Sequence, residues 1–147
     1  MRGSIDMIEK SQNASRLRVT DHKTGMDRTG GVFIVGGGEI LQPVLYSLAT
    51  EAAMGQEVSE ARLFFCTAYG GFAERVVAVN DDVRQQGLQV LEIIDRAVGN
   101  GNLPPAPRAR ACSWCDFISV CGPHEETRSA RKKSDILKDL TLLRDRL

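Results

Sequence analysis

The sequence predicts an α/β fold, in which a small mixed sheet flanked by helices is followed by a cysteine-rich segment and a terminal helix. Three observations predict it. Short apolar runs of alternating polarity indicate strands, apolar stripes at helical spacing lie between and after them, and three of the four cysteines cluster near the C-terminus. The chain has 147 residues, enough for one domain with one hydrophobic core.

The composition is that of an ordinary globular protein, with 42% hydrophobic residues, 26% charged residues and a formal net charge of zero. Zero net charge argues against a non-specific polycation, although local basic patches remain compatible with it. No apolar run approaches the roughly 20 residues that a bilayer-spanning helix needs, and the N-terminus lacks the apolar core of a signal peptide. We therefore expect a cytoplasmic protein without a membrane partner.

The first two strands are expected at residues 4–9 and 16–21, with the polar turn 10–15 between them. This arrangement predicts a β-hairpin. If the turn centres on Asn13 and Ala14, residues whose numbers sum to 27 face each other. A slip of one residue would turn every side chain to the other face, so the prediction depends on this register.

Three charged side chains converge in this register. Asp6 faces Asp21 across the hairpin with Cβ atoms about 5 Å apart, and Lys23 shares the face of Asp21. Two carboxylates suit Mg²⁺ or Mn²⁺, and the backbone carbonyl of His22 is a further candidate ligand. The metal would activate a water, which the lysine would orient or help to deprotonate. The alternative is a pair of solvated strand ends with surface ion pairs.

The remaining elements follow from local patterns. Pro43 is tolerated near the first turn of a helix, and Asn80 is a helix-capping residue followed by two acids. The glycines at 30–31 and 36–38 match no phosphate-binding pattern, and we interpret them as a flexible loop. The expected elements are a loop at 24–38, a helix at 39–54, strands at 62–67 and 73–79, a helix from 80 to about 99, an extended linker at 103–110 and a helix at 125–147.

Two sets of motifs resemble the core of RecB-like PD-(D/E)xK nucleases. Residues 3–6 (GSID) and 19–25 (VTDHKTG) resemble its G-x-I-D … D-x-K-T-G pattern. Gln42 and Tyr46 resemble its Q-x-x-x-Y motif. The resemblance implies a restriction-endonuclease-like fold, with the two aspartates as metal ligands, the lysine as the catalytic lysine, and Gln42 and Tyr46 as residues that support the site or contact DNA. Without it, Gln42 and Tyr46 would be interpreted as a partly buried polar pair on one helix face.

Cys112, Cys115 and Cys121 form a C-x2-C-x5-C pattern, whose soft ligands suit an iron–sulfur cluster or zinc. The fourth ligand has three candidates: His124, Cys66, and a cysteine outside this chain. Cys66 sits in an apolar run and is better interpreted as a buried core thiol. The pattern resembles that of the family's iron–sulfur members, which include AddB helicase–nuclease subunits and CRISPR-associated RecB-like exonucleases. Their likeness implies a [4Fe–4S] cluster whose first cysteine lies upstream of the nuclease core.

That upstream cysteine and the helix that accompanies it are absent from this sequence. We therefore expect residues 1–111 to be a nuclease core that lacks its N-terminal part. Residues 112–147 are expected to form the cysteine-cluster segment and C-terminal helix of the same domain. The absent helix would uncover apolar surface, which favours a homodimer. A basic run fits two interpretations, a solvated helix face or a weak DNA contact. It comprises Arg128, Arg131, Lys132 and Lys133.

The function expected is that of a Mg²⁺- or Mn²⁺-dependent DNA nuclease of exonuclease type. By resemblance it would be of RecB/AddB type and would act in double-strand-break repair with a helicase or helicase–nuclease partner. Two alternatives stay open. One is a catalytically inactive DNA-binding or interaction remnant of such a nuclease. The other is a small structural zinc module built on the three clustered cysteines and His124.

Overall fold

The computed structural model describes residues 3–13, 16–31 and 33–146. The chain divides into two compact units. We call Met1–Leu91 with Arg144–Leu147 the sheet unit, and Glu92–Leu143 the cysteine unit. The predicted division of one domain into a nuclease core (1–111) and a cysteine-cluster segment with a C-terminal helix (112–147) stays a prediction.

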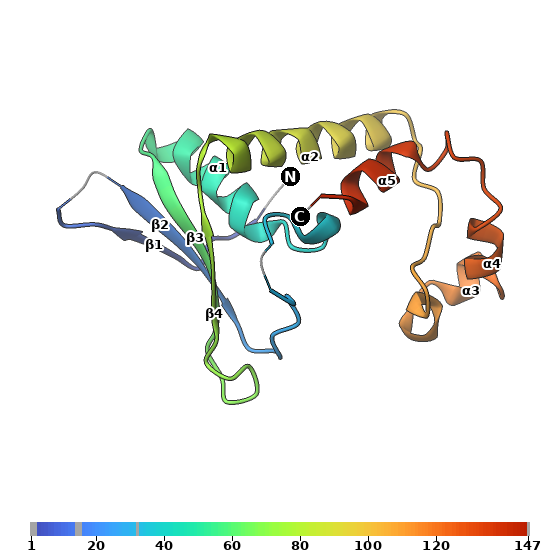
Figure 1. Cartoon of the computed structure of the whole chain (residues 1–147), viewed down its shortest axis with the longest axis horizontal. Helices are drawn as coiled ribbons and strands as arrows, with labels where there is room; N and C mark the ends of the chain where they lie inside the picture. The colour runs from blue at the N-terminus through green and yellow to red at the C-terminus, as the bar shows by residue number, and fades with distance from the viewer. Residues whose placement is uncertain (1–2, 14–15, 32, 147) are drawn as a thin grey trace. The chain divides into compact units, whose positions relative to one another are not determined.

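The sheet unit contains a four-stranded mixed sheet in the order β1-β2-β3-β4 (Figure 1). β2 and β3 are parallel, whereas β1 and β4 pair antiparallel to their neighbours. The predicted mixed sheet is therefore confirmed. β3 begins earlier than the predicted start at residue 62, because Val58, Glu60 and Ala61 already pair with β2. The strands are β1 (Met7–Lys10), β2 (Leu17–Lys23), β3 (Val58–Phe65) and β4 (Glu74–Ala78).

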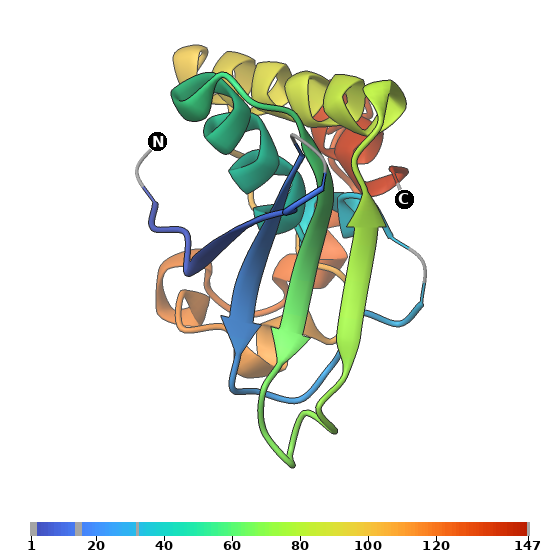
Figure 2. The same cartoon turned by 90° about the vertical axis from the view of Figure 1, so that its left-hand side faces the viewer.

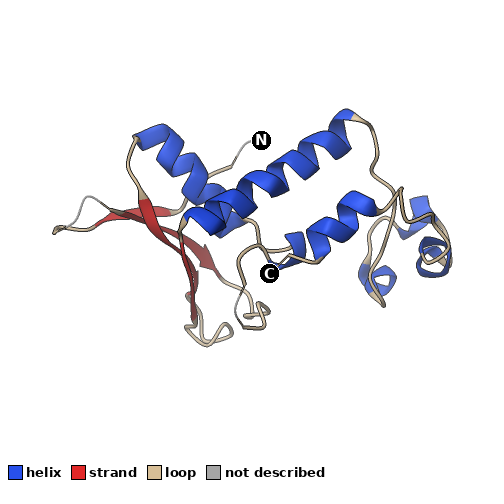
Figure 3. Cartoon of the chain, turned by 45° about the horizontal axis from the view of Figure 1, so that its top comes forward, coloured by secondary structure: helices blue, strands red, loops and turns tan. Residues whose placement is uncertain are grey.

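Helix α1 (Gln42–Met54) makes the crossover between the parallel strands β2 and β3 (Figure 3). The predicted start at residue 39 is wrong by three residues. A short 3₁₀ helix (Gly36–Gly38) and Leu41 precede α1, which places Pro43 in the first turn, where its missing N–H costs nothing. The helix ends at Gly55, whose left-handed φ of 62° a glycine adopts without steric cost.

The core lies between the sheet and α1, and Figure 2 shows the strands in front of this helix. Leu17 and Val19 of β2 and Ala61 and Leu63 of β3 point to this face and are buried. The first half of helix α2 (Asp81–Gly99) packs on α1. The alternation of buried and partly exposed residues along β3 is the pattern expected of a sheet covered on one face.

The opposite face of the sheet carries ion pairs. Arg62 lies at its centre, where its guanidinium contacts the carboxylates of Glu9 and Glu74, each at 3.2 Å, and the hydroxyl of Thr20 at 3.1 Å. This face is therefore polar at its centre. The arginine was not predictable as its centre, because its partners come from three different strands. The expected homodimer stays a prediction.

The cysteine unit contains the second half of α2 and several short helices. The predicted continuous helix at 125–147 is wrong, and Leu147 lies outside the described residues. The chain leaves the helical path near Asp135, whose carboxylate accepts a hydrogen bond from the N–H of Ile136 at 3.0 Å. Such local bonds compete with helix formation. The short elements are a 3₁₀ helix (Ala111–Trp114), α3 (Ile118–Cys121), α4 (Glu125–Ser129) and α5 (Lys138–Arg144).

Apolar residues of the C-terminal segment share a surface with α2. Ile136, Leu140 and Leu143 line an apolar pocket of about 260 Å³ together with Ile93 and Ile94 of α2. An ion pair flanks this pocket, with Arg96 Nη2 2.7 Å from Asp139 Oδ1. The hydrogen bonds from Arg96 lower the pKa of the Asp139 carboxyl. Within the described ranges, no helix has the length and apolar character to cross a bilayer.

Glu51 joins α1, β3 and α2. Its carboxylate accepts hydrogen bonds from Arg84 Nη2 at 2.7 Å and from the N–H of Val58 at 2.8 Å. The bonds from Arg84, together with that of Val58, lower the pKa of Glu51 below its ordinary value of 4.5 although burial opposes the shift. A carboxyl whose pKa is lowered by folding stabilises the protein above that ordinary pKa, and the contribution disappears as the pH falls through the lowered value.

We expect Glu51→Gln to lower the free energy of unfolding by about 1–3 kcal/mol at pH 7, since one acceptor of a charge-assisted network is lost. The difference from the wild type should shrink as the pH falls below about 4.5. Urea denaturation at neutral and acidic pH measures it. Glu57→Gln is the matched control, because its exposed carboxylate lies 3.5 Å from the same arginine and should contribute under about 0.5 kcal/mol. Equal effects of the two variants would contradict the prediction.

Candidate functional site

Asp21 is a buried carboxylate at the C-terminal end of β2. It is 6% exposed, and its Oδ2 atom accepts no well-aligned hydrogen bond from the described residues. The nearest cation to that atom is Lys23 Nζ, at 2.6 Å. The contact is thus an ion pair of poor hydrogen-bond direction, which leaves lone pairs of the carboxylate without a donor. A buried carboxylate in this state is suited to bind a cation.

The predicted hairpin register is confirmed. β1 and β2 pair with Met7 opposite Thr20 and Ile8 opposite Val19, so that facing numbers sum to 27. Continuing the register by one residue places Asp6 opposite Asp21. The predicted turn lies partly at Ala14, which is outside the described residues.

The side chain of Asp6, just before β1, accepts a hydrogen bond from the backbone of β2. Its Oδ2 accepts a hydrogen bond from the N–H of His22 at 2.8 Å and lies 3.9 Å from His22 Nδ1. The side chain of Asp6 therefore reaches the backbone of β2 one residue beyond Asp21.

The carbonyl of His22 points to the same edge of β2. The carbonyl of Lys23 accepts a bond from Cys66 on the β3 side, at 3.0 Å. Because consecutive carbonyls of a strand point in opposite directions, that of His22 points toward β1, where Asp6 lies. The carboxylate of Asp6 and the carbonyl of His22 thus lie on the same side of β2, one residue beyond Asp21.

Gln42 and Tyr46 extend the site from α1. Gln42 is the first residue of the helix, and its Oε1 accepts a hydrogen bond from Lys23 Nζ. Tyr46, one turn later, lies over the segment before Asp6, since a Cβ built on Gly3 would be 3.5 Å from its ring. Helix α1 therefore contacts Lys23 through Gln42 and the N-terminal segment through Tyr46, one turn later.

These residues fit a divalent cation that prefers oxygen. The donors are carboxylate and carbonyl oxygens, one of them a buried atom without a hydrogen bond, and Mg²⁺ completes an octahedral shell with water. In the described part of the chain, no group of three or more His, Cys, Asp or Glu side chains is arranged around a metal position. A metal here would thus depend on water, a backbone oxygen or a substrate oxygen for its remaining ligands.

The segment that follows Lys23 is bonded to the β3–β4 loop and to β4. The hydroxyl of Thr67 donates to the carbonyl of Thr24 at 3.1 Å. Arg75 pairs with Asp27 at 2.6 Å, and hydrogen bonds from Thr29 chiefly, with Arg75 second, lower the pKa of the Asp27 carboxyl. Cys66 lies just beyond β3 rather than inside it, and its thiol contacts the carbonyl of Lys23 at 3.5 Å. Its thiol is only partly buried, so the prediction of a buried core thiol is wrong in this respect.

The three clustered cysteines line one pocket of about 340 Å³ in the cysteine unit. Burial, with the nearby charge of Glu126 second, raises the pKa of the Cys112 thiol. His124 is exposed and is not among the lining residues, whereas the buried Glu125 is. Thiol donors of the right kind therefore share a pocket, but their positions do not form a closed coordination group.

Two residues of the basic run form ion pairs with Glu125, and the other two are exposed. Lys132 and Arg128 both pair with Glu125, the former at 2.7 Å, and the bonds from Lys132 chiefly lower the pKa of that carboxyl. Arg131 and Lys133 are exposed. The weak DNA contact expected from the run is thus available mainly to Arg131 and Lys133, and it stays a prediction.

Comparison with known proteins gives one result that bears on this site. A model of the PD-(D/E)XK nuclease superfamily matches residues 1–122, which include the hairpin, α1 and all three clustered cysteines. No curated protein matches the chain. The match covers most of the sequence, and the mixed sheet with its crossover helix is the fold that the resemblance implied. The chain belongs to the PD-(D/E)XK nuclease superfamily.

Proposed function

We propose that this protein is a Mg²⁺- or Mn²⁺-dependent nuclease that hydrolyses DNA phosphodiesters at the Asp6–Asp21–Lys23 site. The observation that carries the proposal is the buried Asp21 Oδ2, which accepts no well-aligned hydrogen bond and lies beside a lysine ammonium. An ordinary surface ion pair would leave both groups solvated. Membership of a nuclease superfamily supports the reaction class.

The chain's residues would have separate roles. Asp21, Asp6 and the His22 carbonyl would hold the cation, which when bound lowers the pKa of a water and neutralises phosphate charge. Lys23 would orient the attacking water and stabilise the charge that develops on the phosphate oxygens. Gln42 keeps the ammonium of Lys23 beside Asp21 by accepting its hydrogen bond, which preorganises the site before substrate arrives.

The direct test is cleavage of labelled single- and double-stranded DNA by the wild-type chain. We expect cleavage with Mn²⁺ or Mg²⁺, and none with EDTA or with Ca²⁺, whose looser coordination suits the site less well. Products released stepwise from a DNA end would support the exonuclease type. Cleavage that persists in EDTA, or none with any divalent cation, would overturn the proposal, and the second result would favour the inactive remnant.

We also propose that the cysteine pocket binds a soft metal centre, with [4Fe–4S] as the first choice and zinc as the alternative. The shared lining by Cys112, Cys115 and Cys121 supports it. Iron and sulfide analysis with an absorption spectrum would separate the two centres, since iron–sulfur proteins are coloured and zinc proteins are not. A metal-free protein after anaerobic purification would contradict both.

The finer assignment rests on resemblance. A RecB/AddB type would place the nuclease in double-strand-break repair in the cytoplasm, beside a helicase or helicase–nuclease partner. A homodimer is the further association proposed. Light scattering of the purified chain, with and without DNA, tests the homodimer.

A further inference from the structure

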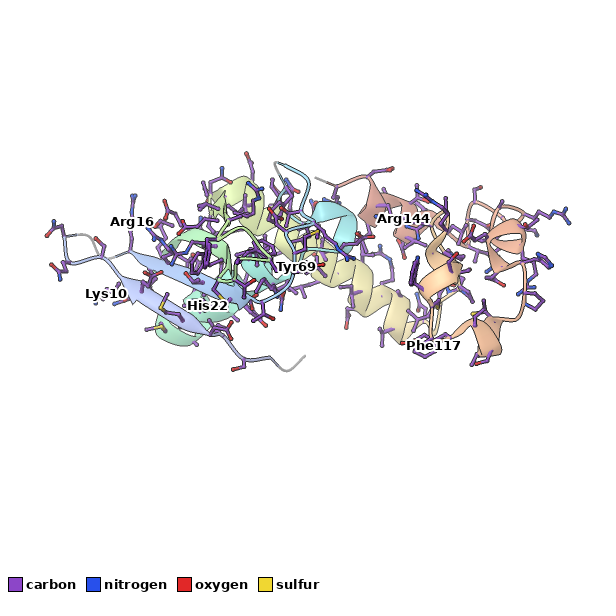
Figure 4. All side chains as sticks on the ribbon, turned by 90° about the horizontal axis from the view of Figure 1, so that it is seen from below. Lys10, Arg16, His22, Tyr69, Phe117 and Arg144 are labelled. Atoms are coloured by element: carbon purple, nitrogen blue, oxygen red, sulfur yellow. The ribbon has the colours of Figure 1, made fainter. Side chains whose placement is uncertain are left out.

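The loop between β3 and β4 exposes two aromatic rings beside the candidate site. Tyr69 and Phe72 are 66% and 62% exposed. The chain has eight residues of the types Phe, Tyr and Trp. Two of them lie exposed in this one short loop, where they contribute little to the hydrophobic core. Figure 4 looks from the side on which this loop projects and labels Tyr69.

The loop starts at the same sheet edge as the candidate site. β2 and β3 are parallel, and Phe65 at the end of β3 pairs with Lys23 at the end of β2. The next N–H group, that of Cys66, bonds to the carbonyl of Lys23. Tyr69 follows three residues later, which limits its Cα to about 11 Å from that of Cys66. A nucleic acid strand held at Lys23 would therefore pass within reach of this ring.

The backbone of the loop is held in one shape. Thr67 accepts three hydrogen bonds from within the loop, each at 3.1 Å. The N–H of Gly70 donates to both the hydroxyl and the carbonyl of Thr67, and the N–H of Phe72 donates to the same carbonyl. Gly70 packs so closely on the carbonyl of Gly25 that an added Cβ would lie 2.8 Å from that oxygen. The rings thus stand on a rigid turn, and a preorganised surface loses little entropy on binding.

Phe72 has a backbone conformation that bulky residues avoid. Its φ of 50° lies in the left-handed region, where glycine or asparagine is the ordinary choice. A phenylalanine kept there, with its ring exposed, gains no burial that would offset the strain. Such an outlier at a loop tip motivates a functional explanation.

We infer that Tyr69 and Phe72 form a base-stacking platform that holds single-stranded DNA at the catalytic end of β2. The inference rests on the proposed nuclease function for its ligand. Aromatic faces stack on any base, but a base can reach them only when it is unpaired. The platform would therefore give the enzyme a preference for single strands or frayed ends, whereas the aspartates and lysine would act on the phosphodiester.

The test measures binding without cleavage. Fluorescence anisotropy in Ca²⁺ would compare the wild type with the double variant Tyr69→Ala/Phe72→Gly on labelled oligothymidylate, on a blunt duplex and on an abasic strand of equal length. Stacking contributes roughly 1–3 kcal/mol per base, or about 5- to 150-fold per ring. We expect the variant to bind oligothymidylate at least about 20-fold more weakly, with duplex and abasic binding unchanged.

Two control variants make the result specific. Tyr69→Phe keeps a ring and should bind as the wild type does. Val76→Ala removes an apolar side chain that is 53% exposed on β4 and should have no effect. Both rings are exposed and glycine suits the φ of Phe72, so the double variant should keep its melting temperature.

The outcomes separate this inference from the proposed function. Wild-type affinity in the double variant, or an equal loss on the abasic strand, would overturn the platform even if metal-dependent cleavage is found. A loss confined to strands with bases would support it even if the wild type cleaves nothing. A wild type that does not bind oligothymidylate also overturns it.

Discussion

Replacing Asp21 with asparagine is expected to reduce metal-dependent DNA cleavage at least about 100-fold, as removal of a preorganised charged group from a catalytic site does. The substitution keeps the shape of the side chain but removes the charge that would bind the cation. Since Oδ2 of this buried carboxylate accepts no well-aligned hydrogen bond from the described residues, the amide should also leave the fold intact. Initial rates with Mn²⁺, and the melting temperature in EDTA, measure the two effects separately.

The companion variant Lys23→Met should lose activity to a similar extent but differ in stability. It leaves the buried carboxylate without the ammonium that now lies 2.6 Å away, so we expect a loss of about 1–3 kcal/mol in EDTA. Added Mn²⁺ should recover part of that stability by binding only the folded protein. Asp81→Asn is the control, because that carboxylate is fully exposed. Full activity in either Asp21→Asn or Lys23→Met would refute the assigned roles.

Gly87→Leu is expected to destabilise the protein by at least about 3 kcal/mol, the upper part of the range for overpacking. A Cβ at this position would lie 2.5 Å from Val44 Cγ1 and 2.9 Å from Leu48 Cδ1. The close approach of α1 and α2 is therefore possible only because position 87 has no side chain. Because α1 carries Gln42 and Tyr46, separation of the two helices should also disturb the candidate site. Denaturant midpoints measure the change in stability.

The control lies in the same helix. Gly99→Ala meets no atom within 4 Å and should be neutral or stabilise the protein by up to about 1 kcal/mol, because alanine favours helix more than glycine does. A similar loss in both variants would contradict the explanation by packing on α1, because Gly99 has no close neighbour and helix propensity favours both substitutions.

The hairpin was predictable because its information is local. Alternating residues on both strands and a short polar turn determine a register, and this register alone places Asp6 opposite Asp21. The start of α1 was harder to predict. Glu39 and Ile40 suit a helix, and only the 3₁₀ helix at Gly36–Gly38 shows where the regular helix begins.

Other parts depend on partners distant in sequence. Arg62 lies in a strand that any pattern would assign, yet its contacts with Glu9 and Thr20 follow from the β2–β3 register, which no short motif encodes. The rings at Tyr69 and Phe72 look like part of an ordinary turn until their exposure is known. The C-terminal helix was predicted as continuous because Ile136, Leu140, Leu143 and Leu147 recur at helical spacing, whereas the bond from the N–H of Ile136 to Asp135 favours a break.

The parallel pairing of β2 and β3 has a consequence for the order of folding events. Asp6 and His22 are 16 residues apart, so the hairpin that brings them together closes a short loop. Thr20 and Arg62 are 42 residues apart, and the strands that carry them can pair only after α1 has formed a crossover. Local contacts generally form faster than distant ones. The contact between Asp6 and His22 would then form early during folding, and the hydrogen bond from Lys23 to Gln42 of α1 would form late. A nascent chain would therefore bring its two aspartate-bearing strands together before its lysine is held in place.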